Sequence, residues 1–167
     1  YSTAVGNNIS TANDYTTAVG HSAKAESDYA TAVGYETVAS GSNSTSIGYK
    51  ARSTGENSIA ISVGIDDRGA TGNQSIAIGH ASNAGADNTT SLGTSARATA
   101  EGATALGYNT DASGTNSLSI GNAAATEASN AIVIGPNAYV QRSGGIAIGN
   151  NAHSGATAST LYGDYAI

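Results

Sequence analysis

The side chains of this chain that could do acid–base chemistry are twelve carboxylates, and they follow a repeating pattern. Five of them recur at one position of a repeat that is expected to form a solvated turn: Asp14, Asp28, Glu56, Asp87 and Glu101. A catalytic pair needs two carboxylates in unlike environments that separate their pKa values, and one exposed column provides a single environment. Lys24, Arg52 and Arg97, at a nearby turn position, can offset the repulsion between stacked like charges. We therefore interpret these acidic residues as solubilising groups.

Metal binding and nucleophilic catalysis have no better support in the sequence. His21, His80 and His153 are far apart along the repeat, and no cysteine is present to supply a thiolate ligand. No Ser-His-Asp order or nucleophile elbow is visible. The aspartate that calcium-binding β-rolls repeat in every nonapeptide is also missing. The sequence therefore predicts a protein that is not an enzyme and that uses no metal or cofactor.

The composition restricts the possible partners. The chain has 167 residues, 22 of them glycine, and a formal net charge of −6. Such a chain has no basic stripe with which to bind nucleic acid or an anionic membrane surface. No apolar run approaches the roughly 18 residues of a membrane span, and there is no signal peptide. Because the chain starts at Tyr1 and ends at Ile167 in mid-repeat, we expect it to be a segment of a longer repeat array.

One hexad, seen most clearly at Asn116-Ser117-Leu118-Ser119-Ile120-Gly121, recurs through the whole chain. Its last residue, here called the anchor, is glycine in all but one copy, where Ser62 takes its place. Ten of the eleven spacings between anchors are 14 residues, and the spacing from Ser62 to Gly79 is 17. The anchors are Gly6, Gly20, Gly34, Gly48, Ser62, Gly79, Gly93, Gly107, Gly121, Gly135, Gly149 and Gly163. A fixed period over a whole chain is the signature of a solenoid.

Aligning the copies on their anchors turns the sequence into columns. Before each anchor stand a large or β-branched residue, a middle residue that is small in most coils, and another large residue, as in Ile146-Ala147-Ile148. We call these the early, the small and the pre-anchor columns. Their period of two predicts a β-strand, and small residues three and five positions after the anchor, such as Ala96 and Ala98, predict a second one. The sequence thus predicts an all-β parallel β-roll of about twelve 14-residue coils.

The predicted roll covers residues 1–167 as a single segment with one interruption. Three extra residues fall within residues 63–69, and the pattern resumes at Ala70, aligned with Ser53. Insertions of this kind form a loop on one face of a solenoid. The loop, which contains Asp66 and Asp67, is either a tolerated bulge or a functional protrusion.

The column sizes suggest an orientation for the first strand. We expect the early and pre-anchor columns to face inward, because they hold the larger aliphatic residues. The small column would then face outward, where alanine permits close approach of another backbone. We therefore predict that identical copies pack there as a closed ring, which three copies would suit. The predicted trimer interface is Ala4, Ala18, Ala32, Ala60, Ala77, Ala105 and Ala147.

These repeats resemble the head of a YadA-like trimeric autotransporter adhesin, whose hexad reads Asn-Ser-Val-Ala-Ile-Gly before a spaced Ala-x-Ala. The matching stretches are Asn57 to Ser62, Gln74 to Gly79, Asn116 to Gly121 and Asn130 to Gly135. The resemblance implies a left-handed roll, a homotrimer and display on the outer membrane of a Gram-negative bacterium. It also implies a role in virulence, through adhesion to host collagen, fibronectin, laminin or an epithelial receptor. The basic neck, the coiled-coil stalk and the membrane anchor of that family are not in the sequence.

Two groups of residues are predicted to bind such a ligand. In some family members the hexads contact collagen, and carrying that over gives Asn57, Ser58, Ile59, Ala60, Gln74, Ser75, Ile76, Ala77, Ser82, Asn116 and Ser117. The alternative for these hexads is that they form only the core strand. Tyrosine is a favoured contact residue, so the second group is Tyr15, Tyr29, Tyr35 and Tyr49.

The sequence therefore favours a non-enzymatic adhesin head that acts through many weak contacts. The alternative is a non-binding spacer of a surface or phage-type fibre. An ice-binding solenoid is a third class, because threonine recurs in the early column. Ice binding needs an outward threonine array, and the predicted orientation places this column inside.

Overall fold

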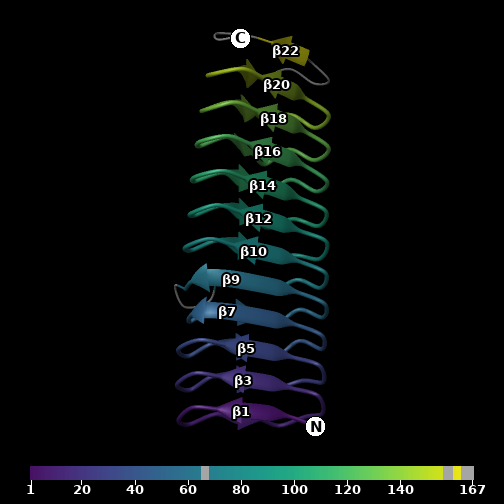
Figure 1. The fold of residues 1–167 in the computed structure, drawn as a ribbon. Helices are drawn as coiled ribbons and strands as arrows, with labels where there is room; N and C mark the ends of the chain where they lie inside the picture. The colour runs from purple at the N-terminus through teal and green to yellow at the C-terminus, as the bar shows by residue number, and fades with distance from the viewer. Residues whose placement is uncertain (65–67, 156–159, 163–167) are drawn as a thin grey trace.

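The protein is a rod of stacked coils, with its two termini at opposite ends (Figure 1). The computed structural model describes residues 1–64, 68–155 and 160–162. Each coil contributes one strand to a twelve-stranded parallel sheet, the main sheet. Its strands are β1 (Thr3–Val5), β3 (Thr17–Val19), β5 (Thr31–Val33), β7 (Thr45–Tyr49), β9 (Ile59–Val63), β10 (Ile76–Ile78), β12 (Thr90–Leu92), β14 (Thr104–Leu106), β16 (Leu118–Ile120), β18 (Ile132–Ile134), β20 (Ile146–Ile148) and β22 (Thr160–Tyr162).

The second strands of the coils form a second sheet in two parts. The first part contains β2 (Ser10–Thr11), β4 (Lys24–Ala25), β6 (Val38–Ala39) and β8 (Arg52–Ser53). The other part contains β11 (Asn83–Ala84), β13 (Arg97–Ala98), β15 (Asp111–Ala112), β17 (Ala125–Thr126), β19 (Tyr139–Val140) and β21 (His153–Ser154). Ala70 joins the two parts through bridges to Ser53 and Ala84.

The predicted register is confirmed throughout the main sheet. Neighbouring strands pair residues 14 positions apart, as Thr17 with Thr31, and Ile59 pairs with Ile76 across the interruption. The bridge between Ser53 and Ala70 also confirms the alignment predicted after the insertion. Asp66, Asp67 and the last anchor, Gly163, lie outside the described residues. The predicted all-β parallel roll is therefore correct.

Two four-residue turns close each coil whose turns lie wholly within the described residues and outside the insertion. After the anchor Gly135, the N–H of Ala138 donates to the carbonyl of Gly135 at 3.3 Å, and Asn137 between them has a φ of 54°. Proline in the second position and asparagine in the third are the residues that a type II turn favours. Gly135 itself has a φ of 136°, and a Cβ atom there would overlap the carbonyl oxygen of Gly149. Anchors are glycine because the backbone of the next coil lies too close for a side chain.

The turn that precedes the main-sheet strand explains the asparagine that begins the hexad. In this leading column, five asparagines have φ values between 54° and 59°: Asn43, Asn57, Asn88, Asn116 and Asn130. Asparagine tolerates this left-handed conformation better than other residues with a side chain. The residue types of the hexad are therefore determined partly by backbone conformation and partly by side-chain packing.

The interior of the roll contains only small side chains, which reverses the predicted orientation. The residues predicted as a trimer interface, Ala18, Ala32, Ala60, Ala77, Ala105 and Ala147, have no exposed surface in the single chain. They face the alanines of the second sheet, such as Ala25 and Ala98. Ala4 is exposed, because β1 ends the sheet and has a neighbouring strand on one side only. The prediction that the six buried alanines contact another copy is therefore wrong, and for Ala4 it stays a prediction.

The distance between the two sheets is the physical reason for this reversal. The hydroxyl oxygens of Ser46 in β7 and Ser53 in β8 lie 2.7 Å apart, across the interior of one coil. Two sheets joined by four-residue turns leave room for alanine, serine, threonine and an occasional valine. The larger residues of the early and pre-anchor columns therefore point outward, as Val5, Ile61 and Leu92 do with 57%, 40% and 40% of their surface exposed.

A matched pair of substitutions tests how tightly the interior is filled. Ala112 in β15 is fully buried, whereas Ala125 in β17 is only half-buried on the outer side of the same sheet. We expect Ala112→Leu to lower the free energy of unfolding by about 1–3 kcal/mol or more, because overpacking forces the sheets apart. Ala125→Leu should change it by less than about 0.5 kcal/mol. Urea unfolding followed by circular dichroism measures both, and equal losses would contradict this account of the interior.

Candidate functional site

The acidic column connects the turns of neighbouring coils. The carboxylate of Asp28 accepts a hydrogen bond from the backbone N–H of Asp14 at 3.2 Å. Asp87 does the same for the N–H of Asn73 at 2.8 Å, and the amide oxygen of Asn73 accepts from the N–H of Glu56 at 2.9 Å. These side chains satisfy backbone donors that point along the rod axis. The column therefore has a structural role that the sequence did not reveal.

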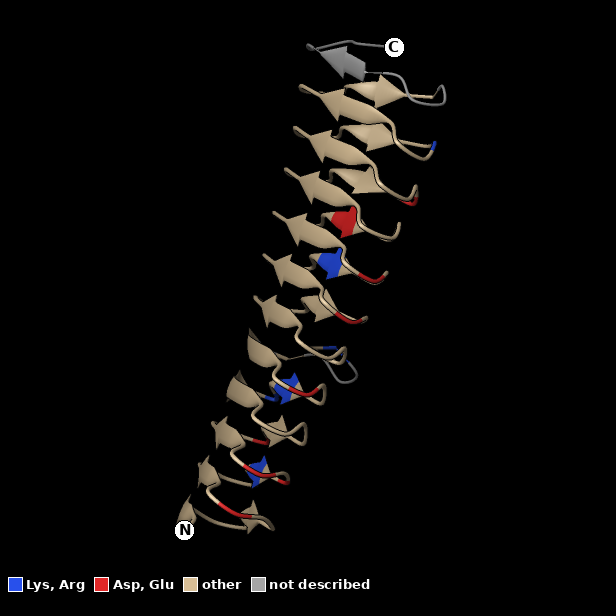
Figure 2. Ribbon diagram, turned by 90° about the vertical axis from the view of Figure 1, so that its right-hand side faces the viewer, with Lys and Arg blue, Asp and Glu red and all other residues tan. Residues whose placement is uncertain are grey.

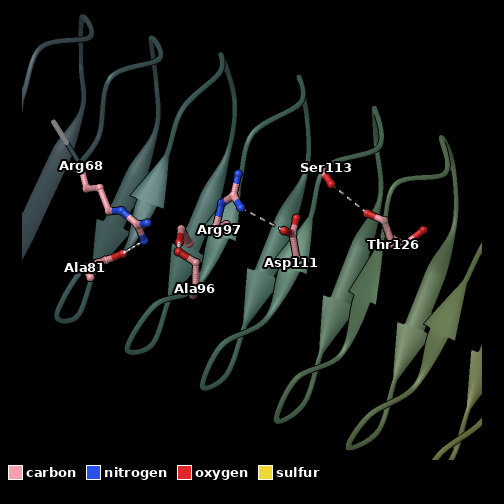
Figure 3. Close-up of polar contacts among 8 residues, drawn as sticks. Arg68, Ala81, Ala96, Arg97, Asp111, Ser113 and Thr126 are labelled. Atoms are coloured by element: carbon pink, nitrogen blue, oxygen red, sulfur yellow. Dashed lines mark hydrogen bonds and ion pairs between the residues drawn. The ribbon is translucent and has the colours of Figure 1, made fainter.

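The basic residues connect coils on the second sheet. Arg97 and Asp111 form an ion pair at 3.5 Å, and Arg68 donates to the carbonyl of Ala81 at 3.1 Å (Figure 3). Lys50 and Glu36 pair at 3.6 Å at a turn. Charges occur on the second sheet and the turns, while the strands of the main sheet show none (Figure 2). Ion pairs this exposed contribute little stability.

The histidines are not brought together. His21 stacks on Tyr35 with ring centres 5.2 Å apart, and His153 lies 5.3 Å from Tyr139. Among the described residues, no three or more His, Cys, Asp or Glu side chains are grouped so that they could hold a metal ion. The same part of the chain contains no helix long and apolar enough to cross a membrane.

Two ladders of aromatic rings run along the first four coils. In the leading ladder, Tyr15 and Tyr29 stack with ring centres 5.2 Å apart and Tyr1 tilts against Tyr15 at 5.9 Å. In the trailing ladder, His21, Tyr35 and Tyr49 stack at 5.2 and 5.3 Å. The leading ladder precedes the main-sheet strands and the trailing ladder follows them, so the two ladders lie at opposite ends of the strands. We call the side of the sheet where the strands begin its leading edge and the side where they end its trailing edge.

The ligand-binding residues predicted from the hexads lie in three different places. Six of them are interior and cannot contact a ligand, which corrects that part of the prediction: Ser58, Ala60, Ser75, Ala77, Ser82 and Ser117. Asn57, Gln74 and Asn116 are exposed in the leading turns, where φ is positive. Ile59 and Ile76 lie on the outer face of the main sheet. The four predicted tyrosines are all exposed, in the ladders.

Sequence reasoning predicted that the early and pre-anchor columns face the interior, whereas they form the outer face of the main sheet. From β1 to β20 its two columns contain only threonine, valine, isoleucine and leucine, and six of the aliphatic residues are at least 36% exposed: Val5, Ile47, Ile59, Ile61, Leu92 and Leu106. Contiguous apolar surface of this extent marks an interaction site in soluble proteins. A signal for it was present, because the position before the early column is also small in every coil.

A shallow groove lies beside the trailing ladder. It measures about 340 Å³ and is lined by Asn8, Ser22, Lys24, Glu36 and Val38. Its side chains come from the turns after the anchors and from the outer side of the second sheet. It combines one cation, one anion and neutral polar groups, a mixture suited to a polar ligand and not to an apolar one.

The stacked coils, the buried small residues and the parallel register define a class, the 14-residue parallel β-solenoids. A sequence profile described as the YadA head domain repeat (2 copies) matches residues 12–37, 39–61, 70–96, 84–110, 112–138 and 127–152. These matches cover well over half of the chain, which therefore belongs to the YadA head domain repeat family, an adhesin-type family. A search of curated proteins returned no significant match.

Tyr35 offers a test of the electrostatics of the trailing ladder. A hydrogen bond to Glu36 and the negative charge of that residue raise the pKa of the Tyr35 phenol above its ordinary value of 10.0. We expect Glu36→Gln to lower the pKa of Tyr35, and Glu127→Gln, many coils away, to leave it unchanged. NMR titration of the tyrosine ring carbons measures this.

The sign of the linked stability change follows from the direction of that shift. Because the folded protein holds the Tyr35 proton more tightly, the stabilisation is present below the unfolded pKa and is lost as the pH rises through the folded pKa. As the solution becomes strongly alkaline, the parent should therefore lose stability relative to Glu36→Gln through this group. An unchanged Tyr35 titration in Glu36→Gln would contradict the assignment.

Proposed function

We propose that this chain is the head of a trimeric adhesin on the outer surface of a Gram-negative bacterium, where it attaches to host extracellular matrix or to an epithelial receptor. Membership of an adhesin-type family supports the adhesive role. The single observation that carries the proposal is the uncharged, aliphatic outer face of the main sheet. Its occupant is two further copies of the same chain.

The composition of this face argues for a protein partner along its whole length. A strand face that stays in water usually carries lysine, glutamate or other charged residues, which also discourage strand association. Here the pre-anchor column is valine, isoleucine or leucine in every coil from Val5 to Ile148. All charged side chains of the described residues lie on the second sheet and the turns instead. This division leaves the charged surfaces for solvent and for a ligand.

Identical copies are the occupant that a single self-complementary face favours. Each chain has one such face, and a closed ring directs every copy of it towards a common axis. Three rolls around that axis keep their second sheets and turns on the outside. The family resemblance supports the number three.

The ligand would then be bound on the outer surface. The exposed candidates there are the turn residues Asn57, Gln74 and Asn116 and the groove beside the trailing ladder. Each contact is small, but similar turns recur in every coil and in every copy. Repetition of this kind increases the effective affinity without any strong individual site.

The two other candidate classes can be weighed against the observed orientation. Thr3, Thr17, Thr31 and Thr45 do face outward, so orientation no longer argues against ice binding. The row is broken by Ile59 and Ile76 in the next coils, however, and exposed aromatic ladders border the threonine row, so the surface is neither long nor uniformly threonine-lined. A non-binding spacer would share the trimer and lack only the ligand, so it is separated by a binding experiment.

Association is tested by the mass of the chain in solution. We expect light scattering to give three times the chain mass of 16.3 kDa. The double variant Ile120→Asp/Ile134→Asp, which places two carboxylates on the outer face, should dissociate to a monomer that keeps its β-sheet circular dichroism. Asn122→Asp, in a turn after an anchor, should remain trimeric. A monomeric parent chain would contradict the proposed ring.

Adhesion is tested with the trimeric protein on a panel of immobilised collagen, fibronectin and laminin and on epithelial cells. We expect saturable binding to at least one of these. Because binding depends on avidity, the dissociated Ile120→Asp/Ile134→Asp variant should bind roughly 10²-fold or more weakly to the same surface. A trimer that binds nothing on the panel would favour the spacer.

A further inference from the structure

We propose that the two aromatic ladders form a seam between neighbouring copies: the leading ladder of one copy (Tyr1, Tyr15, Tyr29) packs along the trailing ladder of the next (His21, Tyr35, Tyr49). The proposal rests on the ring of copies proposed above. It adds a specific contact in the first four coils, made by residues that depart from the repeat of this family.

The position of the ladders brings them to the seam. Tyr29 lies two residues before β5 and Tyr35 two residues after it, so they flank the same strand at opposite edges of the main sheet. In a ring with the main sheets facing the axis, the leading edge of each copy meets the trailing edge of the next. The leading ladder occupies the first three coils and the trailing ladder the second to the fourth. If neighbouring copies stand at the same level, two rings of the leading ladder therefore face two rings of the trailing ladder. If one copy is shifted by one coil along the rod axis, all three rings of one ladder face all three of the other.

The width of the main sheet requires contact beyond its strands. Most strands have three residues, and at about 3.3 Å per residue and 4.8 Å between strands the twelve-stranded face is roughly 10 Å wide and 55 Å long. That strip is about 500–600 Å², whereas a stable interface needs about 800 Å² from each partner and a ring gives every copy two partners. The contact must therefore extend over both edges, where the ladders stand.

The ladders lie along four of the coils whose early column is threonine, although Thr90, Thr104 and Thr160 occupy the same column in coils without a ladder. The early column is threonine in the first four strands, from Thr3 to Thr45, and isoleucine in the next two, Ile59 and Ile76. Aromatic side chains at the edges supply buried area that threonine does not. The coils with Ile59 and Ile76 carry Asn57 and Gln74 at the leading edge instead of tyrosine.

The backbone at the leading ladder supports a role beyond folding. Tyr15 and Tyr29 have φ values of 57° and 59°, where five other coils have asparagine. Bulky residues are disfavoured in this conformation. Strained positions of this kind point to a function that offsets the cost.

Charge favours parallel copies, the arrangement that a ring needs. The leading turns carry five carboxylates, Asp14, Asp28, Glu56, Asp87 and Glu101, and one cation, Arg142. The trailing turns carry one, Glu36, which is paired with Lys50, together with His21 and His80. Antiparallel copies would place the acidic leading edge of one copy against the acidic leading edge of the next. Parallel copies place each leading edge against a trailing edge, which carries few carboxylates.

Engineered disulfides test the seam, because the chain has no cysteine of its own. Tyr29→Cys is combined in turn with His21→Cys, Tyr35→Cys or Tyr49→Cys, which covers a shift of one coil either way. Within one chain these positions lie across the strand, roughly 15–20 Å apart, too far for a disulfide. We expect one pair to give a covalent trimer on a non-reducing denaturing gel that reverts to the single chain on reduction. Two controls should stay uncrosslinked. They are Tyr29→Cys alone and Tyr29→Cys/Tyr108→Cys, in which Tyr108 lies on the trailing edge five coils beyond Tyr35.

A second measurement needs no variant of the ladders. We expect tetranitromethane to nitrate Tyr15, Tyr29, Tyr35 and Tyr49 several-fold more slowly in the parent trimer than in the dissociated Ile120→Asp/Ile134→Asp variant, as followed by peptide mass spectrometry. Equal rates in a parent of trimer mass would overturn the seam and favour a ligand as the partner of the ladders.

The outcomes separate this proposal from the one it rests on. A trimer mass with no covalent trimer from any of the three pairs overturns the seam and leaves the ring. A covalent dimer from Tyr29→Cys alone means that like edges meet, which also overturns the seam. A monomeric parent overturns both.

Discussion

The short distance between the two sheets controls the rest of this structure. Four-residue turns at both ends of a 14-residue coil hold the sheets so close that the hydroxyls of Ser46 and Ser53 meet across the interior at 2.7 Å. Only side chains of the size of alanine, serine, threonine or valine fit there, and the buried residues are of these types. The larger aliphatic residues of the early and pre-anchor columns therefore point outward, and Ile9 in the first coil is an exception that packs against the interior alanines. The apolar outer face is therefore a direct consequence of the thin interior.

Parallel stacking in register is the second constraint, because it repeats each local requirement along the rod. Glycine is favoured at the anchors because the carbonyl of the next coil lies where a side chain would be, as the carbonyl of Gly149 does for Gly135. The leading column favours asparagine because of its positive φ. The same repetition makes ladders from any side chain that recurs, such as the tyrosines of the first coils. The carboxylates of the leading turns use it to accept hydrogen bonds from the neighbouring coil.

Sequence reasoning predicted the features that depend on periodicity and failed on the one that depends on size. The 14-residue coil, the two strands and the resumption at Ala70 all follow from spacing, and the register confirms them. Larger aliphatic residues are usually the buried ones, and this rule placed Ile61 inside and Ala60 outside. The deciding pattern was a pair of small columns two residues apart, such as Ser58 and Ala60. Two small inward residues from each strand define a thin interior, which no single column reveals.

The candidate site was predicted only as far as exposure could be inferred. Tyrosines at turn positions are exposed, as expected, but their stacking along two edges depends on the register between coils and on the width of the strand. Serines of the hexad, such as Ser75, look like polar ligand contacts in the sequence, yet their hydroxyls bond to turn carbonyls inside the roll. Whether a column of serine residues faces the interior or the solvent can be inferred only by comparing the side-chain sizes of the neighbouring columns.

A thin interior also connects stability to association. A core of alanine buries little apolar area per residue, and small cores leave little net stability. The side chains that could contribute most, Ile and Leu of the outer columns, remain half-exposed in the single chain. Covering them with another copy adds the apolar burial that the interior cannot hold. In the proposed trimer, folding and assembly would therefore draw on the same residues, and the stability of the protein would depend on its concentration as well as on its sequence.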